Sequence, residues 1–131
     1  MKKESVVICI FNEKNEVLLL KRSLKDFWMP GKWGLPGGKI DHGEEPIVAM
    51  HRELKEESNL EVSDVLLYNS FVHGNWHVFY YFSRKYSGEL KVSDEHTGAC
   101  WQHIDKLEEI DIIPIALTKV REVFAYVQQN L

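Results

Sequence analysis

Apolar residues gather in two segments near the start of the chain. Ser5 to Phe11 and Val17 to Arg22 are rich in Val, Ile and Leu, and the polar run from Asn12 to Glu16 separates them. Such residues favour β-strands, and a short polar connection between two strands favours an antiparallel hairpin. The pattern therefore predicts a hairpin over residues 5–22.

A second pair of strand-like segments lies in the middle of the chain. Val65 to Val72 and His77 to Arg84 flank the turn-forming run from His73 to Trp76, which predicts another hairpin. The run from Pro36 to Gly38 predicts a turn, because proline and glycine interrupt regular structure. Shorter strands are predicted at Trp33–Leu35, Glu89–Val92 and Ala99–His103.

Two segments carry the signals of helices. One is predicted from Pro46, whose fixed φ suits the first turn of a helix, to Ser58. The other follows Pro114 and has one apolar stripe at steps of three and four residues: Leu117, Val120, Phe124, Val127 and Leu131. Strands mixed with helices favour an α/β fold, with a sheet covered on both faces. At this length a single domain over residues 1–131 is expected.

The net charge of -4 is concentrated in one short segment. Of the 20 acids and 16 bases, six acids and two bases lie between Asp41 and Glu57, and the charges of the remainder cancel. The chain has no run of Lys or Arg, which argues against a protein that coats duplex nucleic acid or binds a membrane through basic residues. Any function must therefore account for the acidic segment.

Three carboxylates share one side of the helix predicted over residues 46–58. At 100° per residue, Glu53, Glu56 and Glu57 fall within an arc of about 100°. The core-facing edge beside them is predicted to contain Ile47, Met50, His51 and Leu54. Like charges at this spacing repel one another. A hard divalent cation such as Mg²⁺ would offset the repulsion, because it binds oxygen ligands and leaves room for substrate phosphates.

The acidic helix is part of a longer motif that begins at a glycine. From Gly38 the motif continues with Glu44 after five residues, with Arg52-Glu53-Leu54 after seven more, and then with Glu56-Glu57 and Leu60. It resembles the Nudix box, G-x5-E-x7-R-E-U-x-E-E-x-G-U with U apolar, at eight of the nine defined positions. The preceding segment from Gly31 to Ile40 also looks like that of MutT-type members of the family.

One position departs from the box, because Asn59 stands where the family has glycine. A helix commonly ends on a residue in the left-handed conformation, which glycine enters freely and asparagine enters more easily than most other residues. Asn59 is therefore expected to end the helix as the glycine does.

The resemblance implies an α/β/α sandwich with a mixed sheet, and an enzyme that uses Mg²⁺ or, as a substitute, Mn²⁺. Nudix enzymes hydrolyse the pyrophosphate linkage of a nucleoside diphosphate joined to another group, X. The implied metal ligands are the carbonyl of Gly37 and the carboxylates of Glu53, Glu56, Glu57 and Glu95. Asp94 is an alternative to Glu95, and one of the four glutamates would be the general base.

Other residues near the motif receive roles from the same resemblance. Arg52 would orient one of the carboxylates, and Glu44 would cap or brace the helix. Arg22 and Lys39 would contact substrate phosphates, or else are solvated surface cations. Phe27, one of several loop aromatics, would stack on the nucleobase, or else such aromatics pack in the core.

The sequence leaves three functions open. The first is hydrolysis of nucleoside or deoxynucleoside triphosphates to the monophosphate and pyrophosphate, which the short MutT-like chain favours. The second is the same chemistry on ADP-ribose, nucleotide sugars or dinucleoside polyphosphates, and the third is a nucleotide-sensing module without catalysis. The chain has no proline between Pro46 and Pro114, which disfavours ADP-ribose, and Ala116-Leu117 stand where relatives specific for oxidised guanine use asparagine.

The remaining features bound the class of protein. No apolar run reaches the length of a signal or transmembrane segment, so a soluble cytoplasmic protein is expected. Cys9 and Cys100 are isolated, and the six histidines lack partners at the usual spacing, which disfavours a disulfide or structural zinc. The expected partner is a small nucleotide, with neither duplex nucleic acid nor membrane, and the protein is expected to be a monomer or homodimer.

Overall fold

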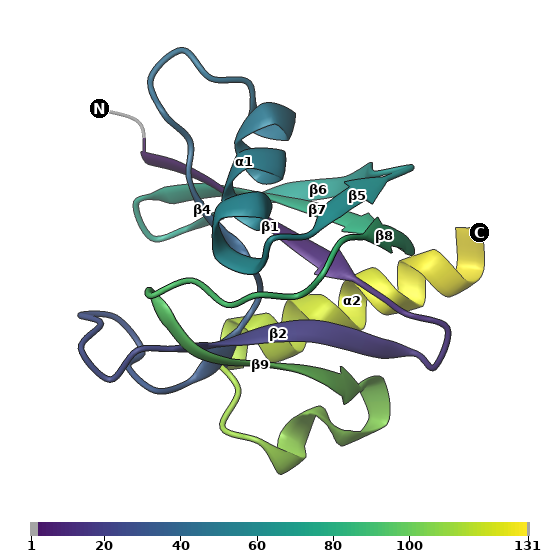
Figure 1. Cartoon of the computed structure of the whole chain (residues 1–131). Coiled ribbons are helices and arrows are strands. Elements are labelled where there is room, and N and C mark those ends of the chain that lie inside the picture. Colours follow the sequence, from purple (N-terminus) through teal and green to yellow (C-terminus); the bar gives the residue numbers. More distant parts are fainter. Residues whose placement is uncertain (1–2, 131) are drawn as a thin grey trace.

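The computed structural model describes residues 3–130, which form two β-sheets, a two-stranded ribbon and two long helices (Figure 1). The strands are β1 (Lys3–Ile10), β2 (Glu16–Arg22), β3 (Trp33–Gly34), β4 (Gly37–Lys39), β5 (Glu61–Ser63), β6 (Leu66–His73), β7 (Trp76–Ser83), β8 (Lys85–Ser87) and β9 (His96–His103). The helices are α1 (Pro46–Ser58), α2 (Pro114–Asn130) and the short 3-10 helix η1 (Ile104–Glu109). Within residues 3–130, no helix has both the length and the apolar character needed to cross a bilayer.

The two sheets together contain parallel and antiparallel pairs. The larger sheet has the order β4-β1-β7-β6, in which β1 is parallel to β7 and antiparallel to β4. Strands β6 and β7 form the hairpin that the sequence predicts. The smaller sheet has the order β3-β2-β9, and β2 is antiparallel to both neighbours. The predicted mixed sheet is therefore confirmed.

The predicted hairpin between the first two strands is wrong. Strand β1 belongs to the larger sheet and β2 to the smaller one, and only an isolated bridge between Phe11 and Val17 links them. The reason is that both sides of β1 are already occupied, by β4 and β7. The polar connection that could close a hairpin instead carries the chain from one sheet to the other.

Two further predictions of local structure differ from the structure, and three short elements were not predicted. The run from Pro36 to Gly38 is not a simple turn, because Gly37 and Gly38 belong to β4 and pair with β1. A side chain at Gly37 would overlap the carbonyl of Val6, so glycine is what permits the close pairing. The segment 89–92 is not a strand, and the ribbon of β5 and β8, with η1, lacked a clear pattern in the sequence.

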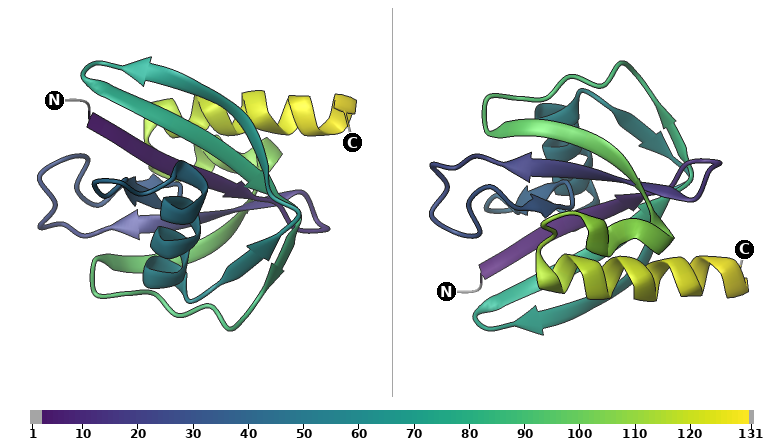
Figure 2. Two further views of the ribbon diagram at one scale, coloured as in Figure 1. Left: turned by 90° about the horizontal axis from the view of Figure 1, so that it is seen from above. Right: turned by 90° about the horizontal axis from the view of Figure 1, so that it is seen from below.

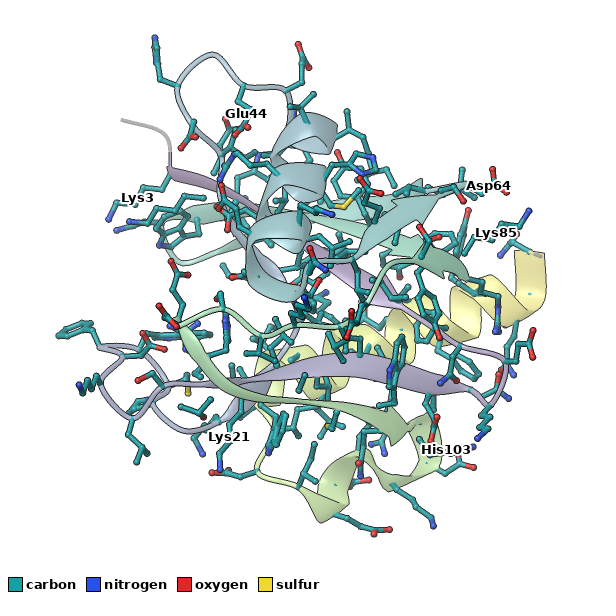
Figure 3. All side chains as sticks on the ribbon, viewed as in Figure 1. Lys3, Lys21, Glu44, Asp64, Lys85 and His103 are labelled. Carbon is teal, nitrogen blue, oxygen red and sulfur yellow. The ribbon has the colours of Figure 1, made fainter. Side chains whose placement is uncertain are left out.

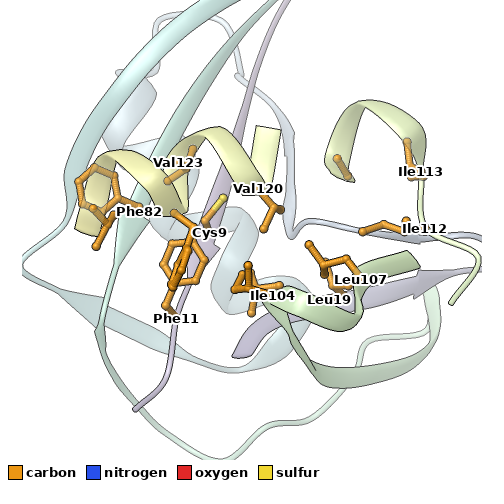
Figure 4. Packing of buried hydrophobic residues seen from close by; sticks show 14 residues of the cluster. Cys9, Phe11, Leu19, Phe82, Ile104, Leu107, Ile112, Ile113, Val120 and Val123 are labelled. Atoms are coloured by element: carbon orange, nitrogen blue, oxygen red, sulfur yellow. The ribbon is translucent and has the colours of Figure 1, made fainter. Parts of the chain in front are cut away.

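The two long helices cover opposite faces of the sheets, as two opposed views show (Figure 2). Side chains alternate along the strands, so Cys9 and Leu19 face the core under α2, whereas Ile8 and Leu18 face the core under α1. Figure 4 shows Cys9 and Phe82 packed against Val120 and Val123 of α2. Both predicted helices, the core position of Cys9 and the α/β/α sandwich are confirmed. Leu131, the last predicted stripe residue, lies outside the described residues.

Candidate functional site

Helix α1 turns its carboxylates further toward the interior than the sequence predicts. Its buried residues are Ala49, Met50, Leu54, Glu57 and Ser58. The prediction that Ile47 and His51 belong to the core-facing edge is wrong, since both are exposed. Helix α1 packs against β1 and against the glycine strand β4, which has no side chain at Gly37 or Gly38 to hold the helix away. The acidic side of α1 therefore lies against the sheet.

Glu57 is a buried carboxylate with little to balance its charge. Only 5% of the residue is exposed. The backbone N–H of Gly37 donates to Oε1 at 2.9 Å, and Nε2 of His96 lies 4.0 Å from Oε2. Burial is the main cause that raises the pKa of Glu57 to about 8; the Gly37 hydrogen bond opposes the rise, the charges of Glu53 and Glu95 contribute to it, and the charge of Arg22 opposes it.

Glu53 lies beside Glu57 and depends on a glycine for its space. A side chain at Gly38 would overlap the Glu53 carboxyl group, so the first glycine of the motif lets this carboxylate keep its position. Partial burial raises the pKa of Glu53, and Arg52 opposes this rise. Glu56, in contrast, has 59% of its side chain exposed. The three carboxylates thus range from buried to exposed along one end of α1.

Arg52 is the centre of an ion-pair network that holds the acidic segment together. Its guanidinium donates to both carboxylate oxygens of Glu44, at 2.8 and 2.9 Å, and to Glu53 Oε1 at 2.8 Å. It also donates to the carbonyl of Lys39 at 3.0 Å and lies 3.3 Å from Glu56. The prediction that Arg52 orients a carboxylate agrees with these contacts.

Glu44 braces α1 through Arg52 and does not cap it. The N-cap residue is Glu45, which makes no capping hydrogen bond with its side chain. The side chain of Glu44 lies beside α1 (Figure 3), where the Arg52 hydrogen bonds and then the Asp41 amide lower its pKa to about 2. Glu44 therefore stays ionised, and both of its oxygens are already bonded to Arg52. It differs in this from Glu57, which faces the cleft and has a raised pKa.

A cleft of about 710 Å³ opens beside these carboxylates. It is lined by Glu53, Glu56 and Glu57, by Gly37 and Gly38, and by Arg22, Lys39, Asp94, Glu95 and His96. The structure thus brings together all the proposed metal ligands and both proposed phosphate contacts. A second cleft, of about 1150 Å³, contains none of the four glutamates expected to bind metal, so its greater size does not make it the better candidate.

Phe27 is a predicted site residue that neither lines the cleft nor contacts its carboxylates; Arg52, also outside the lining, bonds to Glu53. Its side chain is fully exposed in the loop between β2 and β3. That loop is fastened by Arg22, whose Nε donates to the carbonyl of Trp28 at 2.8 Å and whose guanidinium lies 3.6 Å from Asp26. For Phe27 to stack on a nucleobase in the cleft, this loop would have to move.

His96 belongs to the site and was missed by reasoning from the sequence. Its side chain is 8% exposed, and its Nδ1 has no hydrogen-bond partner among the described residues. Burial and then Arg22 lower the pKa of His96, against the effects of Glu95 and Asp26. Its place next to Glu95 in the sequence was the available signal, but its burial depends on the fold.

The chemistry of this cleft fits a hard divalent cation. Its donors are carboxylates, burial disfavours the ionised form of Glu57 that a cation would favour, and Gly38 has no side chain to push the Glu53 carboxyl group away. Across residues 3–130, no three acidic, histidine or cysteine side chains are already arranged as ligands. Binding would therefore draw the carboxylates together, and Glu56, with 59% of its side chain exposed, could turn toward a cation by leaving its 3.3 Å contact with Arg52.

Comparisons with known proteins show the family and the fold. The family model for the NUDIX domain matches residues 1–123. The chain belongs to the Nudix family. The crystal structure of a MutT NUDIX hydrolase from Burkholderia pseudomallei has a TM-score of 0.76 and 29% identity, and the match covers 92% of this chain and 98% of that one. The predicted family and fold are thus confirmed.

Two curated Nudix relatives match parts of the chain. Mouse 8-oxo-dGDP phosphatase NUDT18 is 36% identical over 92 residues, which cover 69% of this chain and 28% of that protein. The 8-oxo-dGTP diphosphatase of Proteus vulgaris is 39% identical over 67 residues, which cover 51% of this chain and 57% of that protein. The chain thus spans about a quarter of the first relative and just over half of the second.

Proposed function

We propose that this Nudix protein hydrolyses the pyrophosphate linkage of nucleoside or deoxynucleoside triphosphates and releases the monophosphate and pyrophosphate. The observation that carries this proposal is the buried charge of Glu57, which lies in a cleft with Glu53, Glu56 and Glu95. Such a cluster suits a cation and, through the cation, a polyphosphate. The names of the two relatives, which describe hydrolases of nucleoside di- and triphosphates, support the same chemistry.

Mg²⁺, with Mn²⁺ as a substitute, would supply charge neutralisation and a lowered pKa for the attacking water. Glu53, Glu56 and Glu57 would hold it, together with Glu95 and the Gly37 carbonyl. One of the four glutamates accepts the proton of the water. Arg52 keeps Glu53 in place through their 2.8 Å hydrogen bond, so that this carboxylate loses less freedom when it binds.

Arg22 and Lys39 would bind the phosphates of the substrate, since both line the cleft and carry positive charge. Arg22 is also tied to the loop that carries Phe27, so a phosphate that attracts Arg22 would affect the position of that loop. A single domain over residues 1–131, a nucleotide as the small-molecule partner, a monomeric or homodimeric state and a cytoplasmic location belong to the same proposal.

A substrate panel tests the proposal. The panel should contain the common nucleoside and deoxynucleoside triphosphates, 8-oxo-dGTP, 8-oxo-dGDP, ADP-ribose, a nucleotide sugar and a dinucleoside tetraphosphate, each with Mg²⁺ and Mn²⁺. We expect triphosphates to be the best substrates, with pyrophosphate as a product. Preference for ADP-ribose or a dinucleoside polyphosphate would contradict the substrate assignment, and tight nucleotide binding without turnover would indicate a sensing module.

Two variants test whether the hydrolysis takes place in the cleft. Glu56→Gln should reduce turnover by about 10²-fold or more, because it removes a negative ligand from a metal site. Glu61→Gln is the matched control, since Glu61 is an exposed acid of β5 that does not line the cleft. Equal turnover in the two variants would contradict the assignment of the cleft.

A further inference from the structure

The segment between β8 and β9 is fastened to the end of α1. The backbone N–H of Lys91 donates to the carbonyl of Ser58 at 2.9 Å, and that of Ser93 donates to the carbonyl of Glu57 at 3.1 Å. These carbonyls belong to the last turn of the helix, where no helical partner is present for them. Residues 89–96, here called the strap, thus satisfy the free end of the helix that carries the carboxylates.

The strap leads directly into the cleft. The N–H of His96 donates to the carbonyl of Ser93 at 3.2 Å, and the N–H of Glu95 donates to the Ser93 hydroxyl at 3.4 Å. These bonds form a turn that places Glu95 and His96 in the lining of the cleft, with His96 4.0 Å from Glu57. The position of both residues therefore depends on how the strap is attached to α1.

Asn59 provides the outer attachment of the strap. It ends α1 in the left-handed conformation, with φ 66°, and its backbone N–H bonds to the carbonyl of Lys55 at 2.9 Å. Its side-chain Nδ2 donates to the carbonyl of Glu89 at 2.9 Å, at the point where the strap begins. Glycine could adopt the same backbone conformation at lower cost, but it has no side chain to donate this hydrogen bond.

We propose that Asn59, the one departure from the Nudix box, is a positioning residue for the metal-binding cleft. Its side-chain amide tethers the strap at Glu89 and so sets the place of Glu95 and His96 against Glu57. The inference rests on the proposed function, because it gives Glu95 a share in binding the cation. It predicts that restoring the family's glycine harms the site while sparing the fold.

The test compares Asn59→Gly and Asn59→Asp with Asn15→Gly. Glycine relieves the left-handed backbone and aspartate keeps the shape of asparagine, yet neither can donate to Glu89. Asn15 is the matched control, because it has φ 59° in the turn between β1 and β2 and its side chain donates no hydrogen bond to residues 3–130. Amide hydrogen exchange and Mn²⁺ titration, both without nucleotide, serve as readouts besides turnover.

We expect both Asn59 variants to exchange the amide hydrogens of Lys91 and Ser93 faster, and to bind Mn²⁺ about threefold to tenfold more weakly, as the loss of one hydrogen bond allows. Asn15→Gly should change neither quantity. Unchanged exchange in the Asn59 variants would overturn the inference, and so would faster exchange with unchanged Mn²⁺ affinity. Intact Mn²⁺ binding without hydrolysis in the unmodified protein would contradict the proposed function alone.

Discussion

Helices α1 and α2 each bury one charged residue within residues 3–130, and the two charges have very different surroundings. Lys119 of α2 is 7% exposed, and its Nζ lies 3.3 Å from Glu122 and 3.3 Å from the centre of the Phe71 ring. Glu57 of α1 is 5% exposed, and its carboxylate meets the Gly37 amide and the ring of His96. Lys119 therefore has an acidic partner and lies over an aromatic ring, whereas Glu57 has no basic side chain within ion-pair distance unless His96 is protonated.

This difference in surroundings indicates that Lys119 has a structural role, whereas Glu57 is available to bind a ligand. Burying a charge is costly unless an opposite charge or hydrogen bonds replace the lost water. Glu122 and Phe71 meet that need for Lys119 inside the protein. For Glu57 the pKa is raised to about 8, mainly by burial and in smaller part by the acidic neighbours Glu53 and Glu95. A divalent cation would remove this imbalance, whereas α2 needs no ligand.

The largest expected effect comes from neutralising Glu57. Glu57→Gln should lower metal-dependent hydrolysis by about 10³-fold and weaken Mn²⁺ binding, because it removes a carboxylate ligand. The metal-free variant should unfold at the same temperature or higher, since an amide can be buried with neither a charge nor the uptake of a proton on folding. Lys119→Met is the comparison, and its Mn²⁺ affinity should stay within about twofold of the original. Hydrolysis that survives Glu57→Gln would contradict the role of this carboxylate.

The second expected effect is a pH dependence of stability in the metal-free protein. The folded pKa of Glu57, about 8, lies above its ordinary value of 4.5, so the folded state holds its proton more tightly than the unfolded state does. This contribution is fully present below about pH 4.5, and it is lost as the pH rises through about 8. The loss should be on the order of a few kcal/mol of unfolding free energy.

Urea denaturation with a chelator at several pH values between 5 and 8 would measure this loss. Comparing the protein with Glu57→Gln isolates one group, because the variant should lack that part of the pH dependence. Saturating Mg²⁺ should also reduce it in the unmodified protein, since the cation favours the ionised carboxylate. Parallel pH profiles for the two proteins would show that Glu57 is not the group responsible.

The smallest expected effect lies at α2. Lys119→Ala should lower the unfolding free energy by roughly 1–3 kcal/mol, because it removes the buried stem and the contact with Phe71. Lys119→Met should cost less than about 1 kcal/mol, since it fills similar space and leaves the partly exposed Glu122 able to interact with water. Denaturant titration of both variants measures the difference. Equal losses would mean that the charge itself stabilises α2.

Prediction from the sequence worked best where the structure is local. The bounds of α1 follow from Pro46 and from the residue preference at Asn59, and the hairpin of β6 and β7 follows from its turn. Predictions failed where a distant partner decides. The pairing of β1 depends on β4 and β7. The segment 89–92 forms no strand, because the carbonyl of Glu89 and the N–H of Lys91 form hydrogen bonds with the end of α1.

The candidate site shows the same division. The four glutamates, Arg52, Arg22, Lys39 and the glycines could be named from the motif and the family resemblance. All of them except Arg52 line the cleft, and Arg52 bonds to Glu53 from beside it. The burial of Glu57 and the role of His96 could not be named, because helical spacing gives the direction of a side chain but not what covers it. Phe27, an aromatic chosen by residue type alone, lies outside the cleft in the exposed loop.

The sequence alone determined the acidic helix, the glycines that precede it and hence the family, because these depend on residue type and on spacing along the chain. It predicted a turn at Gly37 and Gly38, where the structure has strand β4. Only the tertiary structure decided which carboxylate is buried, that Arg52 satisfies Glu44, and that Asn59 holds the strap. Charge balance and burial are properties of neighbours in space. Gly37 lies 20 positions before Glu57, and His96 lies 39 positions after it; the three become neighbours only when the sheets and α1 have packed together.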